Sequence, residues 1–514
     1  MTVSHHKLRP SYTLLAIGLI ATLTVVRFFI AGWFELSGDE AYYWLWSRHL
    51  DWSYFSKGPG IAVTIALGTK IFGNTAFGVR WIAVALSAGT GWLLFRLAES
   101  LFSPRVAYWT VVAAVMVPLF SAGGFIMTID PLSVFFWALA AWWFWKGLES
   151  SHLLSWVPAG LAVGVGMLCK YTNAFELLSF ALFLVWSKKH RGRQLFRPSD
   201  SLVTWKNRGE LLRGRFWVMV LVALLCLWPV VVWNSQHGWI TVEHLLHRGG
   251  LDHRPRFTPG NVLDFIAGQF AVFNPFLAIA WLMAVFFAWG KFGEKEEYLL
   301  SLSLPVLLFY FALSFNSPVQ LNWTALAFVT ALPFLVEYWL RWSDHSKLYL
   351  YAARGALGIS TALLLIGHLI LFIYLPGYFK MPYDPIRRIK GWSDLAAQVQ
   401  QLEKEHGASF IICNKYTFAS LIEFYHPDHP GVFVPASEGL TNQFSYWLDY
   451  RDGYDWESAI FVSDTPDVPA ELQREFVSVQ PLGNIFSRSG GKPMYEFFIF
   501  LLRKYHSPQT LSQP

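Results

Sequence analysis

The sequence predicts an all-α polytopic membrane protein that ends in a small α/β domain. Of its 514 residues, 54% are apolar, 18% are aromatic and only 14% are charged. A soluble globular protein carries about 25% charged residues, so this chain has too few to cover a water-facing surface of its size. The net charge of +6 is typical of basic loops on the cytoplasmic side of a membrane. We therefore expect membrane lipids around the chain and no nucleic-acid partner.

Apolar stretches long enough to cross a bilayer occur eleven times. A spanning helix needs about 20 mostly apolar residues. Ser11–Ile30 is longer than the apolar core of a signal peptide, roughly 7–15 residues, so we expect it to be the first span. Ile61–Phe72 is too short to span, and it predicts an interfacial or re-entrant helix. The predicted spans are 12–32, 77–97, 105–122, 131–148, 153–169, 173–187, 216–233, 262–289, 298–314, 321–340 and 350–375.

The charges of the loops predict the orientation of these spans. Lys188–Arg215 is the most basic segment, so it should be cytoplasmic. With Ile61–Phe72 left out of the count, loop 33–76 and everything after Pro376 then lie on the outer face. Counting that stretch as a span would place the most basic loop outside. We therefore favour eleven spans.

The tail after the last span changes character, because it is richer in charged and turn residues. Trp392–His406 reads as a helix, and three short apolar runs read as buried strands: Phe410–Cys413, Val432–Val434 and Ile460–Val462. Strands that alternate with helices predict a small α/β domain. The predicted organisation is a transmembrane domain over 1–376, with an outer juxtamembrane loop over 33–76, and an extracytoplasmic domain over 377–514.

Two adjacent carboxylates, Asp39 and Glu40, follow the first span inside a dense aromatic segment. Trp and Tyr favour the membrane interface, and a carboxylate at this place can simply cap a helix. Composition alone leaves that structural interpretation and a functional one open.

Three further ionisable residues are expected on the outer side: Lys57 in loop 33–76, and Asp130 and Lys170 at the outer ends of predicted spans. Lys57 precedes Gly-Pro-Gly, where the backbone can approach a ligand closely. Each has a structural alternative, namely a snorkelling lysine or a charge at a helix N-terminus. Ionisable groups at membrane depth are costly, however, and are functional candidates by default. We therefore expect acids and bases to meet at the outer ends of several helices.

These motifs resemble the membrane-embedded glycosyltransferases of the C-type fold. More narrowly, the pattern is similar to family 39 and its relatives, the dolichyl-phosphate-mannose protein mannosyltransferase and aminoarabinose transferase-like group. The resemblance covers roughly residues 10–345 and departs from the family at Lys57-Gly-Pro, which has one proline where members often have two. The matching motifs are Asp39-Glu40-Ala-Tyr42, Lys57-Gly-Pro, Asp130-Pro-Leu-Ser, the glycine-rich run Gly160–Lys170, and Glu243-His244 with Arg248.

The resemblance implies transfer of a sugar from a polyprenyl-phosphate donor to an acceptor on the outer face of the membrane. The phosphate leaving group needs cations to stabilise its charge, and Lys57, Arg248 and Lys170 are the candidates. The acceptor hydroxyl needs a general base, for which Asp39 is the best candidate. Inversion at the anomeric carbon is implied by analogy with the family.

The remaining candidate residues have supporting roles in this interpretation. Glu40 would position Asp39 or a substrate, or help to bind a metal, and Asp130 would hold a sugar hydroxyl or orient the base. We expect substrate contacts from Tyr42, Tyr43, His244 and Asn322. No cofactor is predicted with certainty, and a divalent metal stays open, because His244 and His247 can share a helical face.

Two basic features near the outer face are left with open interpretations. Arg254 and Arg256 could hold a phosphate by bidentate hydrogen bonds. Arg27 lies near the outer end of the first span and could either snorkel or face a cavity.

The sequence thus favours an inner-membrane glycosyltransferase whose acceptor is lipid A or lipopolysaccharide, another glycan or a protein. The main alternative is a transporter or flippase of lipid-linked sugars. A transporter would place its charges at mid-membrane, often in repeated halves, and no repeat is visible. A non-catalytic envelope scaffold would leave the charged residues without a role. The favoured interpretation requires Asp39, Lys57 and Asp130 to meet in one pocket open to the outer leaflet.

Overall fold

The computed structural model describes residues 11–186, 211, 214–250, 258–372, 385–435 and 442–506. Most of the basic segment 188–215, the residues Arg254 and Arg256, and the predicted domain boundary at 376 lie outside the described residues. The chain forms two compact units. The first comprises Met1–Phe28, Lys57–Gly60 and Ile82–Tyr374, and the second comprises Phe29–Ser56, Ile61–Trp81 and Leu375–Pro514. The predicted division into 1–376 and 377–514 stays a prediction.

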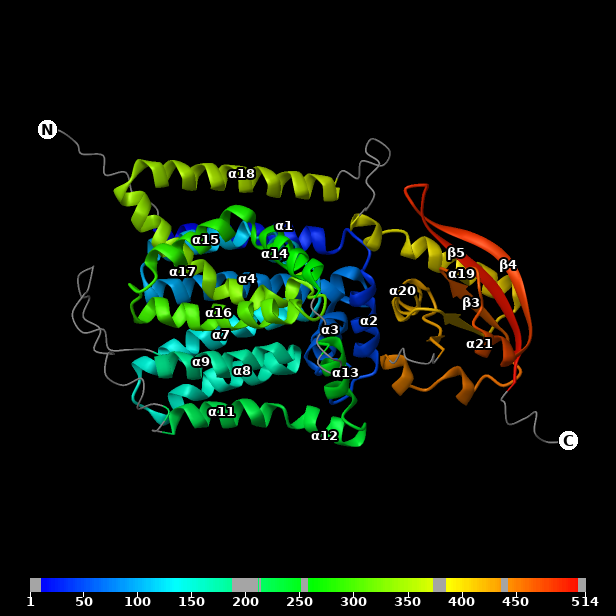
Figure 1. Cartoon of the computed structure of the whole chain (residues 1–514). Helices are drawn as coiled ribbons and strands as arrows, with labels where there is room; N and C mark the ends of the chain where they lie inside the picture. Colours follow the sequence, from blue (N-terminus) through cyan, green and yellow to red (C-terminus); the bar gives the residue numbers. More distant parts are fainter. Residues whose placement is uncertain are drawn as a thin grey trace. The chain divides into compact units, whose positions relative to one another are not determined.

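Among the described residues up to 372, the regular secondary structure is helical (Figure 1). Their bounds are α1 Tyr12–Ala31, α2 Gly38–Arg48, α3 Gly60–Phe72, α4 Ala76–Leu101, α5 Pro104–Val115, α6 Pro118–Gly123, α7 Ile129–Glu149, η1 Leu153–Trp156, α8 Val157–Cys169, η2 Tyr171–Ala174, α9 Phe175–Trp186, α11 Arg215–Cys226, α12 Trp228–Gln236, α13 Ile240–Arg248, α14 Pro259–Phe273, α15 Pro275–Ala288, α16 Glu294–Ser314, η3 Leu321–Thr324, α17 Ala325–His345 and α18 Lys347–Phe372.

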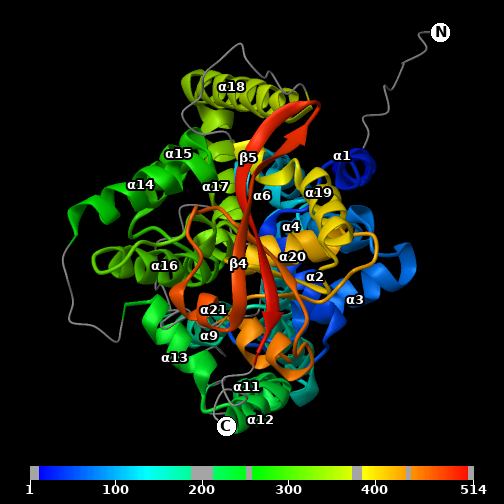
Figure 2. The ribbon, with the colours of Figure 1, turned by 90° about the vertical axis from the view of Figure 1, so that its right-hand side faces the viewer.

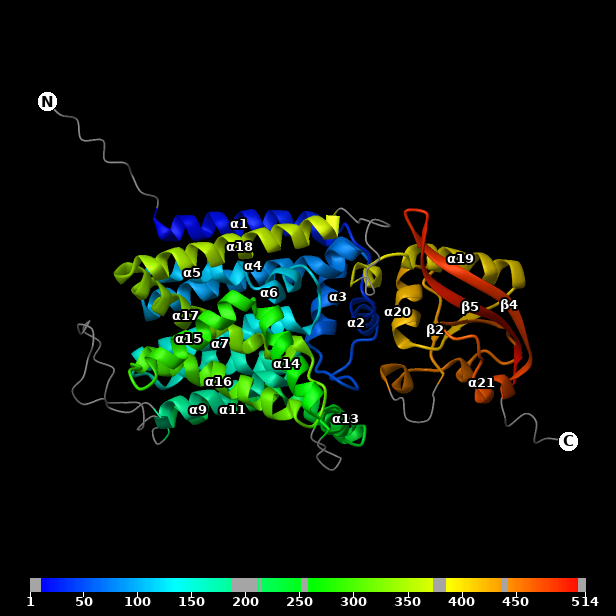
Figure 3. The ribbon, with the colours of Figure 1, turned by 45° about the horizontal axis from the view of Figure 1, so that its top comes forward.

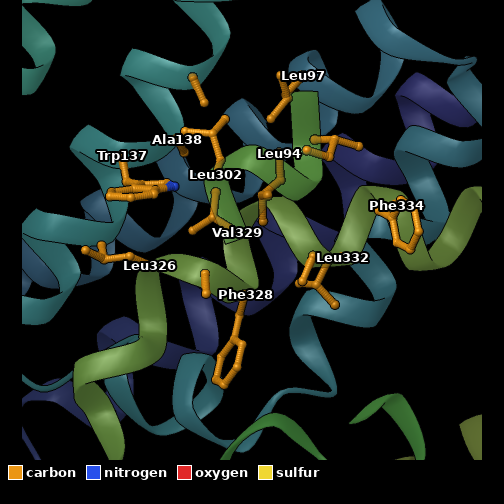
Figure 4. Close-up of a cluster of buried hydrophobic side chains, with 14 of the residues drawn as sticks. Leu94, Leu97, Trp137, Ala138, Leu302, Leu326, Phe328, Val329, Leu332 and Phe334 are labelled. Atoms are coloured by element: carbon orange, nitrogen blue, oxygen red, sulfur yellow. The ribbon is translucent and has the colours of Figure 1, made fainter. Parts of the chain in front are cut away.

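Helix α17 is the centre of the first unit, because 83% of its most apolar stretch is buried. Its side chains pack against those of α4, α7 and α16, as the close-up of Leu94, Trp137, Leu302, Phe328 and Val329 shows (Figure 4). By contrast, only 17% of α1 and 6% of α18 is buried over the corresponding stretches. These two helices run along one edge of the bundle (Figures 1 and 3). Their exposed apolar faces suit lipid contact.

Five described helical segments are long and apolar enough to cross a membrane, or up to seven if each bent pair is one span. The prediction of eleven spans is therefore neither confirmed nor excluded. Helix α3, at 13 residues, is short, as expected for Ile61–Phe72.

Proline divides three of the predicted spans. The predicted span 262–289 is two helices, α14 and α15, bent by 104° at Asn274-Pro275. Pro275 cannot donate the helical hydrogen bond, and Asn274 takes a φ of 86°. Pro229 lies at the start of α12, which is bent by 44° from α11. Pro118 begins α6 in the same way after α5. Proline favours the first turn of a helix, so a new helix begins at each of these prolines.

The second unit contains the α/β part of the tail, with a five-stranded sheet in the order β2-β1-β3-β5-β4 (Figure 2). Strand β1 is parallel to β2 and β3, whereas β5 is antiparallel to β3 and β4. The predicted strands and helix are present, and β4 and β5 were not foreseen. The bounds are η4 Pro385–Ile389, α19 Trp392–His406, β1 Phe410–Cys413, α20 Tyr416–Tyr425, β2 Val432–Phe433, η5 Gln443–Tyr446, η6 Tyr450–Asp452, β3 Ala459–Ser463, α21 Ala470–Arg474, β4 Phe476–Ser489 and β5 Lys492–Tyr505.

Candidate active site

The two adjacent carboxylates at the start of α2 have opposite surroundings. Ser37 caps the helix, and its hydroxyl and backbone N–H both donate to the Glu40 carboxylate, at 3.1 and 3.0 Å. Glu40 is fully buried, whereas Asp39 is exposed. Only Asp39 can therefore meet a substrate directly without a change of conformation.

Arg80 on α4 is the partner of Glu40. Its Nε and Nη2 donate to the two carboxylate oxygens, each at 2.7 Å. The same guanidinium donates to the backbone carbonyl oxygens of Ala31, Phe34 and Glu35 at 3.1, 2.7 and 2.9 Å. Arg80 thereby joins the end of α1, the connecting turn and the start of α2. Sequence analysis missed Arg80, although an arginine within the apolar segment 77–97 is the kind of signal that marks a functional or structural partner.

The N-terminus of α2 packs closely against the tail. A Cβ at Gly38 would lie 2.9 Å from the Cβ of Thr417 on α20, so the two helices touch at this glycine. The Tyr42 ring is buried 4.4 Å from the Tyr416 ring, and its hydroxyl accepts a hydrogen bond from the Gln443 backbone N–H at 2.7 Å. Burial raises the pKa of the Tyr42 hydroxyl. Tyr42 thus packs within the second unit, while Tyr43 is only half-buried.

Three residues that are far apart in the chain meet in the first unit. Asp130, in the first turn of α7, accepts a hydrogen bond from Lys170 Nζ at 2.7 Å and another from Asn322 Nδ2 at 2.6 Å. Lys170 is 7% exposed and Asp130 is 17% exposed. The three residues form a fixed polar centre, an ion pair with an additional amide donor. They lie at the start of α7, just after α8 and in η3. We call these three residues the Asp130 cluster.

The loop that carries Lys57 lies against the end of α8. A Cβ at Gly58 would lie 2.3 Å from the carbonyl oxygen of Leu168, which is closer than any side chain could approach. The glycine therefore lets the Lys57 loop reach the turn that precedes Lys170.

Positive charge gathers around His244 on α13. Burial, and after it the charges of Lys57, Arg248 and His247, together lower the pKa of His244 to about 4. The Arg248 guanidinium also lies 5.5 Å from the Trp323 ring, next to Asn322 in the sequence. His244 is thus neutral at pH 7 in a cationic environment, which suits a bound anion. We call Lys57, His244 and Arg248 the cationic group.

The structure thus describes two sets of the predicted residues, one in each unit. Asp130, Lys170, Asn322, Lys57, His244 and Arg248 belong to the first unit, and Asp39, Glu40, Tyr42 and Tyr43 to the second. Whether Asp39 shares a pocket with Lys57 and Asp130 stays a prediction. Within the described part of the chain, no group of three His, Cys, Asp or Glu side chains could hold a metal ion. The question of a divalent metal therefore stays open.

Comparison with known proteins finds chains of similar sequence and of similar fold. Residues 56–233 match the family model of the dolichyl-phosphate-mannose-protein mannosyltransferases. The lipid A galacturonosyltransferase RgtD of Rhizobium johnstonii is 25% identical over 79% of this chain and 81% of its own length. An undecaprenyl phosphate-alpha-4-amino-4-deoxy-L-arabinose arabinosyl transferase of Pseudomonas savastanoi is 30% identical, over 28% of each chain.

Solved structures share the fold over nearly the whole chain. ArnT from Cupriavidus metallidurans in the apo state has a TM-score of 0.64 at 15% identity, over 95% of this chain and 98% of that one. The same protein bound to undecaprenyl phosphate has a TM-score of 0.60 at 13% identity, over 94% and 97%. The chain therefore has the fold of ArnT, as its resemblance to the C-type glycosyltransferases implies. Over residues 56–233 its sequence is also similar to the dolichyl-phosphate-mannose-protein mannosyltransferases, the group that the motifs resemble.

Proposed function

We propose that the protein transfers a sugar from a polyprenyl-phosphate donor to lipid A, or to a closely related envelope lipid, on the periplasmic face of the inner membrane. The single observation that carries the proposal is the Asp130 cluster in the same unit as the cationic group. Such a pairing of fixed acid and clustered cations suits transfer from a phosphate leaving group. The names of two relatives, a lipid A galacturonosyltransferase and an undecaprenyl phosphate-aminoarabinose transferase, support the same reaction class.

The donor phosphate is the group that the cations would hold. It is ionised at neutral pH, so its departure requires positive charge rather than a proton donor. Lys57 and Arg248 supply that charge, and both contribute, after burial, to the low pKa of His244. Lys170 is already paired with Asp130, so its role is to hold that carboxylate as well as to add charge.

The acids divide into a base and two positioning groups. Asp39 is exposed in the first turn of α2 and is our candidate for the base that accepts the proton of the acceptor hydroxyl. Glu40 acts through Arg80 to hold the turn that carries Asp39. Asp130, oriented by Lys170 and Asn322, would bind a sugar hydroxyl. Direct attack on the anomeric carbon then inverts its configuration.

A transporter or flippase of lipid-linked sugars is the weaker function. It would need charged residues on discontinuous helices at the membrane midplane. Here Asp130 and Lys170 lie at helix ends, and the relatives bear the names of transferases.

The test compares the lipids of four strains. They are a deletion strain and the same strain complemented with the wild-type gene, the Asp39→Asn gene or the Asp51→Asn gene. Asp51 is an exposed carboxylate in the same segment and serves as the matched control. We expect the deletion and Asp39→Asn strains to lack one sugar increment in the mass spectrum of lipid A, and the Asp51→Asn strain to keep it. Loss of the base should lower kcat at least a hundredfold. Full transfer by a well-expressed Asp39→Asn protein would refute the assignment.

A further inference from the structure

An apolar cavity of about 260 Å³ lies in the first unit, between α1, α4, α5, α6 and α7. Its lining includes aliphatic side chains such as Ile20, Leu94 and Val111, together with Asp130. The cavity therefore connects apolar surface at the depth of the spans with the carboxylate of the Asp130 cluster. Its volume is below the roughly 300–1,000 Å³ of pockets that enclose a whole small molecule, so it suits a segment of a larger ligand.

Arg27 is the cation of this cavity. It lies one turn before the end of α1, yet it does not snorkel outward. Its Nη1 donates to Ser87 Oγ on α4 at 2.6 Å, and a Cβ at Gly124 would lie 2.5 Å from its Cζ. The guanidinium therefore points into the bundle, where it lines the cavity.

The charge of Arg27 is not neutralised by any carboxylate within the described part of the chain. A guanidinium has five N–H donors, and the contacts of Arg27 are the Ser87 hydroxyl and, at 3.5 Å, the Phe120 carbonyl oxygen. Asp130 lines the same cavity, but its two oxygens already accept from Lys170 and Asn322. An uncompensated charge at membrane depth is costly. A bound anion would remove that cost.

We propose that this cavity binds the acceptor lipid, with Arg27 holding an anionic group of its head and the apolar part holding one hydrocarbon chain. The inference rests on the proposed function and deepens it by assigning the acceptor a site. The donor phosphate has a separate site in the cationic group, which includes α13. Helix α1 lies on the opposite side of the bundle from α13 (Figures 1 and 2). A transferase with two lipid substrates needs two such entrances, and Asp130 lies at the lining of this one.

Two pairs of variants test the site. Arg27→Gln removes the charge, and its control is Arg105→Gln, which affects an exposed arginine paired with Asp344. Ala88→Phe fills the cavity, and its control is Ala85→Phe, the same change three residues earlier on an exposed position of α4. Arg27→Lys keeps a charge and should rescue part of the loss.

The measurement is the Kd of the purified full-length protein in nanodiscs for lipid A and, separately, for undecaprenyl phosphate. We expect Arg27→Gln and Ala88→Phe to weaken lipid A binding about ten- to hundredfold, as for a lost charged hydrogen bond. Undecaprenyl phosphate binding should stay within twofold, and both controls should resemble the wild type. Dephosphorylated lipid A should bind the wild type and Arg27→Gln alike.

Several outcomes would overturn the inference. Equal losses for both lipids would assign the cavity to the donor, and an unchanged lipid A Kd in both variants, or no lipid A binding by the wild type, would remove the acceptor site. These results are separate from the fate of the proposed function. If Asp39→Asn abolishes transfer while the Arg27 and Ala88 variants behave as wild type, only this inference fails.

Discussion

Asp39 and Glu40 are neighbours in the chain, yet one is exposed and the other is enclosed in a buried ion pair with Arg80. A pair of identical charges in a sequence motif suggests two similar roles. The structure separates these roles, because Ser37 and Arg80 together donate hydrogen bonds to both carboxylate oxygens of the buried Glu40. We infer that the motif combines a reactive carboxylate with the anchor that holds it.

Removal of either partner of that ion pair should destabilise the protein. Arg80→Met leaves the Glu40 carboxylate buried without its cation and frees three backbone carbonyl groups. Breaking a buried pair costs about 3–5 kcal/mol, so the thermal unfolding midpoint in detergent should fall by several degrees. Asp39→Asn should leave that midpoint unchanged. Equal midpoints for Arg80→Met and the wild type would contradict the anchoring role.

The pKa of His244 predicts a pH dependence of donor binding. Burial and nearby cations hold this pKa at about 4, below the ordinary value of about 6.5. The unfolded state therefore binds more protons between pH 4 and 6.5, and the stability that His244 contributes above pH 6.5 is lost as the pH falls through this window. A phosphate bound beside His244 stabilises the imidazolium and raises its pKa again.

The measurement is the Kd for undecaprenyl phosphate at pH 7.5 and pH 5, in the wild type and in His244→Asn. Titration of the phosphate itself is common to both proteins and cancels in the ratio. If the bound anion raises the pKa by one unit, the wild type gains about twofold in affinity over the variant at pH 5. A ratio that does not change with pH would place the phosphate away from His244.

At the scale of elements, the catalytic candidates lie where helices begin or end. Asp130 lies in the first turn of α7, Lys170 follows the last turn of α8, and Asn322 lies in η3 before α17. Helix ends combine unpaired backbone groups with access to water. The Lys57 loop packs closely against one of these helix ends, that of α8.

A methyl group at Gly58 should disturb this arrangement. It would collide with the Leu168 carbonyl oxygen, a backbone atom that cannot move aside cheaply. We expect Gly58→Ala to displace Lys57 and to raise the donor KM about tenfold, with a smaller effect on the acceptor KM. Gly260→Ala is the control, because nothing lies within 4 Å of a Cβ at that position. An unchanged donor KM would show that the close approach of the loop to α8 does not matter for donor binding.

At the scale of the whole molecule, the orientation of the chain is the main prediction still to be tested. Basic loops stay on the cytoplasmic side, so a reporter inserted within 188–215 should be active inside the cell. Alkaline phosphatase fused after residue 377 should be active in the periplasm, because eleven spans bring the tail to the outer face. Phosphatase activity at the first position, or its absence at the second, would contradict the span count.

The sequence was sufficient to predict a membrane protein and to name the three residues of the Asp130 cluster. The shortage of charged residues dictates a lipid-facing surface. Asp130 and Lys170, each within a motif, and the separate candidate Asn322 are residues that the fold brings into contact. Arg80 was missed because its partners, Glu40 and three carbonyl groups, come from a segment about 40 residues away. The bends at Asn274-Pro275 and before Pro229 were missed, because each apolar stretch was predicted as one straight span. Apolar composition indicates contact with lipid, but it does not indicate where a helix changes direction.

The sequence by itself determined that this protein requires a lipid environment. It also identified the ionisable residues whose placement at membrane depth costs enough free energy to suggest a function. Both follow from the transfer free energies of side chains, which do not depend on the fold. Only the tertiary structure decided which of two adjacent carboxylates is buried, which lysine is paired, and that Arg27 points into a cavity. Those outcomes depend on groups that are distant in the chain, because the field and the space around each charge come from its neighbours in three dimensions.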